Sequence, residues 1–157
     1  MLDREIDRLL GILESWKGTR YASGQRTKGV SADCVGFALS AVDEFYGWQR
    51  ACDPLLPSDA AFHNPLAARK AVAAIRRLYN PAERLRPAGG YTDLQPLDIL
   101  VVGTSAGGPG HLMLVGPRRN TLWHCSNTAG ACQTGWSLGD GYERLHAAYR
   151  CLGGVAR

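Results

Sequence analysis

The 157-residue sequence lacks several features that would assign it to a specialised class of protein. It has no long hydrophobic run: stretches such as ILVV at residues 99–102 are far shorter than the roughly 20 residues that cross a bilayer, so we expect no membrane insertion. It also has little excess charge, because 18 Lys and Arg stand against 14 Asp and Glu. A net charge of +4 does not indicate nucleic-acid binding. With no repeat or linker visible, the length predicts one domain, residues 1–157.

A secretory signal is also missing from the sequence. The first residues, MLDREIDRLLGILESW, carry acids where a signal peptide has a basic region, so we expect a protein made in the cytoplasm without a leader. Apolar residues recur there at spacings of three and four, which predicts the buried face of an amphipathic helix. They are Leu2, Ile6, Leu9, Leu13 and Trp16.

The five cysteines form no CxxC pair. An odd number of thiols in a chain without a signal favours reduced cysteines, although Cys125 and Cys132 are close enough in sequence for a bridge to stay an alternative. A zinc site built from His111, His124 and these two cysteines is disfavoured, because the spacing matches no standard ligand pattern. We therefore expect neither a metal nor a cofactor.

Helices are expected in the first part of the chain. A Gly, Ser and Thr-rich loop leads to a helix over residues 33–46, with Asp33 as N-cap, Cys34 in the first turn and Gly47 as its stop. A longer segment, residues 48–90, then precedes the next apolar run. It contains one further helix, capped by Asn64. We expect that helix to turn four apolar residues inward: Leu66, Val72, Ile75 and Leu78.

Most of the excess positive charge lies in this 48–90 segment. A group of its basic residues lies between residues 69 and 86 with Glu83 as the one acid among them, and its members are Arg69, Lys70, Arg76, Arg77, Arg84 and Arg86. Charged side chains on a helix usually form a solvated face. A docking surface for an anionic partner is the alternative.

Strands are expected after residue 90. The runs DILVV (98–102), HLMLV (111–115) and TLWHC (121–125) are short, apolar and separated by Gly-rich turns, and AAYRC (147–151) resembles them. Helices followed by antiparallel strands predict an α+β fold, with the N-terminal helices packed on one face of the sheet.

Cys34 is placed for nucleophilic chemistry. Unpaired N–H groups and the helix dipole at a first helical turn favour a thiolate, and the same N–H groups suit the oxyanion that forms when an amide carbonyl is attacked. A buried packing role for this cysteine is the alternative.

Two histidines fall on predicted strands, whereas His63 and His146 are expected on the surface. If Gly116 lies opposite Thr121 in the hairpin, His124 faces residue 113 and His111 is its diagonal neighbour on the same face. One imidazole then serves as base to Cys34 while the other orients it, as in a catalytic triad. A bulge of one residue would instead send them to opposite faces.

These pieces together resemble the NlpC family of cell-wall cysteine peptidases, which have a compact papain-like fold. The resemblance rests on WKGTRYASGQRTKGVSADCVGFAL, then LDILVVGTSAGGPGHLMLVG, then LWHC, and covers roughly residues 8–125. It implies Cys34 as nucleophile, His111 as base and later acid, and His124 as orienting residue. It also implies that Tyr21 helps to bind the oxyanion or substrate and that Asp33 contacts a substrate amine; packing and helix capping are their respective alternatives.

Two departures from the family pattern narrow the expectation. Val35 stands where many wall-cutting relatives have a serine, and the basic 48–90 segment is a long insertion. Both features look more like family members of phage tails and gene-transfer particles. The resemblance therefore implies a peptidoglycan peptide as substrate, other tail or particle proteins as partners, and a virion tail acting at the cell wall as location. A structural tail module with little hydrolase activity, and another thiol amidase or transacylase, are the alternative functions.

Overall fold

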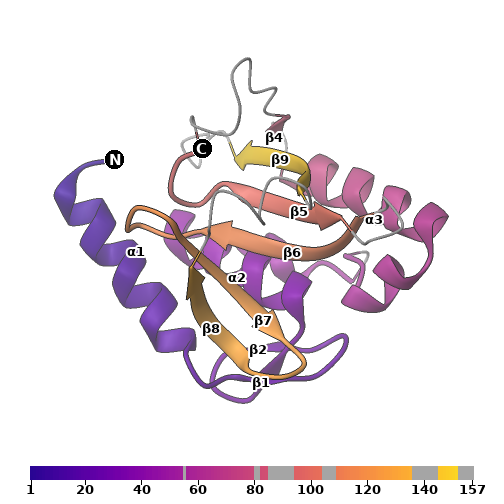
Figure 1. Ribbon diagram of the computed structural model, residues 1–157, viewed down its shortest axis with the longest axis horizontal. Helices are drawn as coiled ribbons and strands as arrows, with labels where there is room; N and C mark the ends of the chain where they lie inside the picture. The colour runs from indigo at the N-terminus through magenta and orange to yellow at the C-terminus, as the bar shows by residue number, and fades with distance from the viewer. Residues whose placement is uncertain (55, 80–81, 85–93, 104–108, 136–144, 152–157) are drawn as a thin grey trace.

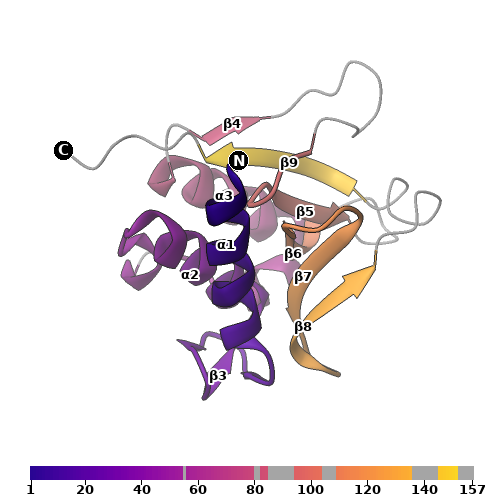
Figure 2. The same cartoon turned by 90° about the vertical axis from the view of Figure 1, so that its left-hand side faces the viewer.

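The computed structural model describes residues 1–54, 56–79, 82–84, 94–103, 109–135 and 145–151. Its helices lie on one side of a strongly curved antiparallel sheet (Figures 1 and 2). This mixed helix and sheet architecture agrees with the predicted fold class. No helix in the described ranges is long and apolar enough to cross a bilayer.

The main sheet has six strands in the order β4-β9-β5-β6-β7-β8, and all neighbours are antiparallel. Four strands lie where apolar runs predicted them: β5 (Ile99–Gly103), β6 (Pro109–Val115), β7 (Thr121–Ser126) and β9 (Leu145–Cys151). The short β4 (Ala82–Arg84) and the Gly-rich β8 (Gly130–Gly135) were not predicted, since neither has an apolar run.

The β6–β7 hairpin has the predicted register. The backbone N–H of Gly116 donates to the carbonyl of Thr121 at 2.8 Å, and Leu114 pairs with Trp123. This register turns Leu114 and Trp123 into the core, where neither is exposed to solvent. His124 therefore lies on the opposite face of β7 from Trp123.

The central helix α2 (Cys34–Tyr46) begins and ends as its caps predicted. The Asp33 carboxylate accepts the N–H of Gly36 at 2.6 Å, and Gly47 ends the helix in the left-handed conformation with φ of 70°. Such a φ is strained for residues with a side chain. Because α2 packs between helix α1 and strands β6 and β7, apolar residues cover most of its circumference.

Helix α1 (Asp3–Trp16) packs on α2 through Leu9, Leu13 and Trp16, which are buried as predicted. The ring of Trp16 meets Phe37 edge to face, with centroids 5.5 Å apart. Leu2 was predicted on the same face but is 58% exposed, because it is the N-cap and lies outside the first helical turn.

The loop before α2 contains a small three-stranded sheet of β1 (Arg20–Tyr21), β2 (Arg26–Thr27) and β3 (Ser31–Ala32), in the order β1-β3-β2. This loop lies against the first turn of α2: a Cβ on Gly36 would be 2.3 Å from the carbonyl oxygen of Gln25. The loop therefore depends on a glycine at position 36.

The insertion is helical, with short 3-10 turns η1 (Arg50–Cys52) and η2 (Asp59–His63) and the helix α3 (Pro65–Leu78). Asn64 caps α3 as predicted, and Ile75 is buried. Leu66 was predicted to face inward but is 64% exposed; Ala68 and Ala71 supply buried contacts there. The Arg84 side chain and the whole of Arg86 lie outside the described residues.

Candidate active site

Cys34 is the first residue of α2, and its position is fixed by Asp33. The Asp33 carboxylate accepts backbone N–H groups from Gly36, Gly24 and Asp59, at 2.6, 2.8 and 3.1 Å. These bonds join the helix start, the preceding loop and the insertion. Asp33 thus has the capping role, and with no exposed surface its carboxylate offers no access to a substrate amine.

The two strand histidines lie side by side. Nε2 of His111 is 2.9 Å from Nδ1 of His124, so the predicted neighbourhood across the β6–β7 hairpin is present. The ring planes are nearly perpendicular, at 82°. Nδ1 of His111 makes no hydrogen bond within the described part of the chain.

A cavity of about 300 Å³ brings Cys34 and His111 together at the N-terminal end of α2. The backbone N–H of Leu112, the residue after His111, points at the Cys34 thiol. Within the described residues the thiol makes no hydrogen bond to either imidazole. Nucleophile and base candidates therefore share one cavity without a preformed contact. Such contacts often tighten only when substrate binds.

The Cys34 thiol is held in its neutral form. Burial raises its pKa to about 12, and the charge of Asp33 adds to this effect. The backbone N–H groups of Leu112 and Val35 favour the thiolate but do not outweigh burial. The first-turn N–H group of Val35 thus favours a thiolate as expected, but the desolvation of Cys34 outweighs this effect.

Both imidazoles are also held neutral. Burial, with a smaller contribution from His124, lowers the pKa of His111 to about 4, and burial lowers the pKa of His124 from its ordinary value. A neutral His111 that donates its Nε2 proton to His124 keeps a lone pair on Nδ1. That nitrogen can accept the proton of a thiol, so the site is arranged as a neutral thiol and a neutral base.

Tyr21 also lines the cavity, and its hydroxyl is already committed. It donates to the carboxylate of Asp59, which accepts a second hydrogen bond from the Ser23 hydroxyl at 2.5 Å. A tyrosine has one hydroxyl hydrogen. In this conformation Tyr21 therefore has no hydrogen to donate to an oxyanion.

Five cavity residues were not predicted as site residues: Asp59, Gly110, Cys125, Ser126 and Asn127. The last three follow directly after His124, so their place at the end of that strand was a usable signal. Asp59 had no local signal, because it reaches the cavity from an insertion 26 residues after Asp33. Val35 is fully buried and is not among the cavity residues.

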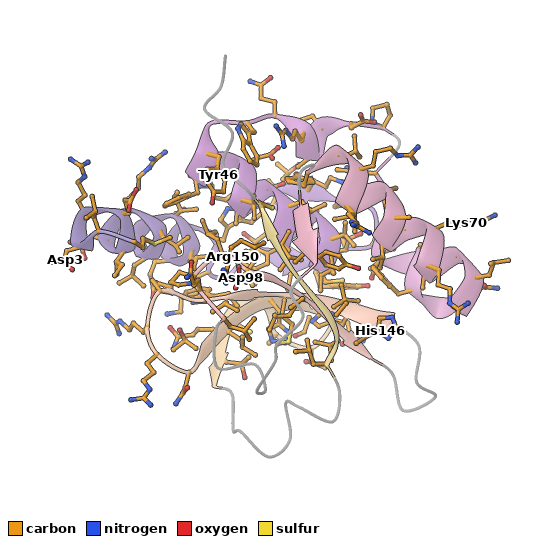
Figure 3. All side chains as sticks on the ribbon, turned by 90° about the horizontal axis from the view of Figure 1, so that it is seen from above. Asp3, Tyr46, Lys70, Asp98, His146 and Arg150 are labelled. Atoms are coloured by element: carbon orange, nitrogen blue, oxygen red, sulfur yellow. The ribbon has the colours of Figure 1, made fainter. Side chains whose placement is uncertain are left out.

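The structure also places two further cysteines and His146, whereas the side chain of His63 lies outside the described residues. Cys125 and Cys132 are free thiols, and they pair across β7–β8 with Ala131 and His124, which places them on opposite faces of the sheet. No group of three His, Cys, Asp or Glu side chains in the described ranges is arranged to hold a metal. His146 is exposed on β9, as Figure 3 shows.

No model of a protein family matches this sequence, and no curated protein matches it. Solved structures do match this chain in fold. One is a protein from Staphylococcus aureus described as similar to lipoprotein, NLP/P60 family, with a TM-score of 0.56. The sequences are 15% identical, over 97% of this chain and 43% of that one, so this chain spans less than half of the solved relative. The likeness is one of fold, and it agrees with the family that the sequence resembles.

Proposed function

We propose that the protein is a cysteine peptidase that hydrolyses amide bonds in peptidoglycan peptides. The observation that carries the proposal is the cavity shared by Cys34 and His111, together with the hydrogen bond between His111 and His124. A nucleophile, a base and an orienting group are the components of thiol-dependent acyl transfer. The NLP/P60 fold of the Staphylococcus aureus protein supports this reaction class.

The first half of the proposed reaction forms a thioester. The Cys34 sulfur attacks the carbonyl carbon of the substrate while its proton moves to Nδ1 of His111. The negative charge passes to the carbonyl oxygen, for which the backbone N–H groups of Val35 and Leu112, which also favour the Cys34 thiolate, are candidate donors. The C–N bond then breaks, and His111 returns the proton to the departing amine.

The second half releases the product. Water attacks the thioester carbonyl and His111 accepts a proton from that water. The C–S bond then breaks as His111 returns the proton to the Cys34 sulfur, which gives a carboxylic acid and the free thiol. His124 accepts from Nε2 of His111 throughout and keeps the ring oriented. Every step uses water and the chain's own residues.

The test is digestion of purified peptidoglycan, followed by mass spectrometry of the soluble fragments. Wild type is expected to release fragments with a new amine and a new carboxylate within the stem peptide, and Cys34→Ala is expected to release none. Cys52→Ala is the matched control, because Cys52 is exposed and outside the cavity. Equal release by wild type and Cys34→Ala removes Cys34 from the mechanism. Products in which the acyl group has moved to another acceptor, such as an ester, would favour the alternative of another thiol amidase or transacylase.

We further propose that the enzyme works in a phage tail or prophage-derived particle that opens the cell wall. Support comes from the apolar Val35 after the nucleophile and from the basic insertion, the two features in which the chain departs from many wall-cutting relatives. Immunogold labelling of purified particles tests this location. Labelled tails are expected, and an antigen found only in the cell lysate contradicts it.

A structural tail module is the second candidate function. One observation favours it: α3 and Tyr149 of β9 line a surface hollow of about 490 Å³ with the basic residues Arg69, Arg76 and Arg77. An acidic surface of a neighbouring particle protein would complement this charge. If Cys34→Ala particles assemble and infect normally while Arg76→Gln with Arg77→Gln blocks assembly, this candidate replaces the peptidase.

A further inference from the structure

The surface hollow between α3 and β9 is a second site, which the proposed reaction does not use. We call it the basic hollow; its volume is about 490 Å³, and its lining residues are Arg69, Val72, Ala73, Arg76, Arg77 and Tyr149. None of these residues lines the cavity that contains Cys34 and His111. The volume is in the range of sites that bind ligands.

The arginines of the basic hollow have no acidic partner within the described part of the chain. Arg69, Arg76 and Arg77 are exposed, and their side chains form no ion pair or hydrogen bond with a described residue. Helix α3 itself contains no Asp or Glu. Residues seven positions apart lie on nearly the same side of a helix, about 10 Å apart along its axis, so Arg69 and Arg76 form one positively charged strip.

Tyr149 adds an uncharged hydrogen-bond donor to this strip. Only 8% of the residue is exposed, and its hydroxyl makes no hydrogen bond within the ranges that the structure describes. A tyrosine that is buried to this extent usually has a partner for its O–H group. Three guanidinium groups and an unpartnered hydroxyl around one hollow are suited to a ligand that carries negative charge and accepts hydrogen bonds.

The proposed substrate supplies such groups. Stem peptides of peptidoglycan have carboxylates at their ends and along the chain, and a guanidinium group binds a carboxylate through two parallel N–H donors. Peptidoglycan is also a network, which extends far beyond any one scissile bond. A single substrate molecule can therefore occupy the cavity and the basic hollow together, and binding at one site raises the effective concentration at the other.

We infer that the basic hollow is a second binding site for peptidoglycan, which holds stem-peptide carboxylates while Cys34 cleaves another part of the network. The inference rests on the proposed peptidase function and adds a substrate-binding site to it. The arginines of the hollow bind the polymer and take no part in the chemistry. Their effect is therefore expected on the intact wall, and not on a short soluble peptide that ends near the scissile bond.

The first experiment measures the apparent Kd of the protein for purified, insoluble peptidoglycan from which phosphate polymers have been removed. All proteins carry Cys34→Ala, so that the wall stays intact. Adding Arg76→Gln with Arg77→Gln is expected to raise the Kd about 5-fold, the scale of two exposed ion pairs. Adding Tyr149→Phe is expected to raise it about 3-fold through the loss of one hydrogen bond. Added salt should weaken binding, because it screens exposed charges.

Two controls show whether the effect belongs to the hollow and to carboxylates. Arg118→Gln with Arg119→Gln removes the same charge from an exposed pair in the β6–β7 hairpin, outside the basic hollow, and should keep the Kd of the Cys34→Ala parent. Amidation of the wall carboxylates should raise the Kd of that parent about 5-fold or more and leave Arg76→Gln with Arg77→Gln with little further effect.

The second experiment uses the active enzyme and separates binding of the wall from chemistry. It compares kcat/KM on suspended peptidoglycan with kcat/KM on a soluble stem peptide. Arg76→Gln with Arg77→Gln is expected to lower the ratio of the two values about 5-fold, through a higher KM on the wall. A loss by the same factor on both substrates would contradict a separate binding site.

The outcomes distinguish this inference from the proposed function. If the arginine substitutions and amidation leave the Kd unchanged, or if the protein binds only wall that keeps its phosphate polymers, the inference is wrong and the peptidase proposal stands. If the substitutions block particle assembly but not wall binding, an acidic protein occupies the hollow instead. If the arginines bind the wall but wild type cleaves neither wall nor peptide, the peptidase proposal fails and the binding site remains.

Discussion

Nε2 of His111 lies 2.9 Å from Nδ1 of His124, across the hairpin of β6 and β7. In the tautomer in which Nε2 of His111 donates, Nδ1 of His124 accepts and the lone pair on His111 Nδ1 stays available. The register of the hairpin produces this arrangement, because side chains near each other on one face of two strands come within contact. The orientation of His111, the candidate base that shares a cavity with Cys34, therefore depends on its hydrogen bond to His124 on the neighbouring strand β7.

We expect His124 to act only as a hydrogen-bond acceptor for Nε2 of His111. Two substitutions distinguish this role from the filling of space by the side chain. His124→Asn keeps an oxygen that accepts from Nε2 of His111, whereas His124→Leu fills space without an acceptor. We expect kcat to fall about 10²-fold or more for His124→Leu and about 10-fold or less for His124→Asn, the scale of a misoriented general base. Steady-state kinetics on a stem peptide measures both. Wild-type kcat in His124→Leu would show that His124 orients nothing.

The pH dependence of kcat/KM should reflect a base that is hard to protonate. His111 has a pKa lowered to about 4 by burial, so it is neutral and able to accept a proton at every pH above that value. Activity is therefore expected to rise as the pH increases through about 4 and to show no acid limb near 6.5, the ordinary imidazole value. A single limb near 6.5 in a profile of initial rates would contradict a buried, neutral His111.

Alkylation of the cysteines should follow exposure and ionisation. Burial raises the pKa of Cys34 to about 12, so its thiolate is scarce at neutral pH. Iodoacetamide at mildly acidic pH is expected to modify the exposed Cys52 first, and Cys34 labelling is expected to accelerate as the pH rises. Peptide mass mapping follows each site. Rapid modification of Cys34 below neutral pH would mean that a thiolate is preformed after all.

Gly36 should be intolerant of a side chain. The added Cβ in Gly36→Ala would lie 2.3 Å from the carbonyl oxygen of Gln25, a contact that forces the loop away from α2. We expect a loss of about 1–3 kcal/mol in the free energy of unfolding, typical of overpacking at a buried site, together with reduced activity. Urea unfolding measures the loss. Gly11→Ala is the control, since no atom lies within 4 Å of its added Cβ.

The sequence predicted the elements whose signals are local. Asp33 and Gly47 are caps with their own chemistry, and they bound α2 where expected. The hairpin register followed from a short turn, and this register predicted the contact of His111 with His124. Periodicity was less reliable at helix ends, where Leu2 is the exposed N-cap of α1 and Leu66 is exposed in the first turn of α3.

The rest of the site depends on packing between distant segments. The Arg26 guanidinium donates to backbone carbonyls in the segment just before Asp59, which lines the cavity. Residue types alone do not predict such contacts, because every residue has a backbone carbonyl. The neutrality of Cys34 is likewise a product of burial by β6, which overrides the local preference of a helix terminus for a thiolate. Strand β8 forms from a Gly-rich run because pairing with β7 compensates for weak intrinsic propensity.

Two thiols line the same cavity, and substituting each in turn is the sharpest test of the nucleophile. Cys34 begins α2, whereas Cys125 lies in β7 and donates its thiol hydrogen to the carbonyl of Ala32. Release of stem-peptide fragments from purified peptidoglycan should fall below detection in Cys34→Ala and stay within a few fold of wild type in Cys125→Ala, with both variants folded by circular dichroism. Full activity in Cys34→Ala, or equal loss in the two variants, would contradict Cys34 as the nucleophile.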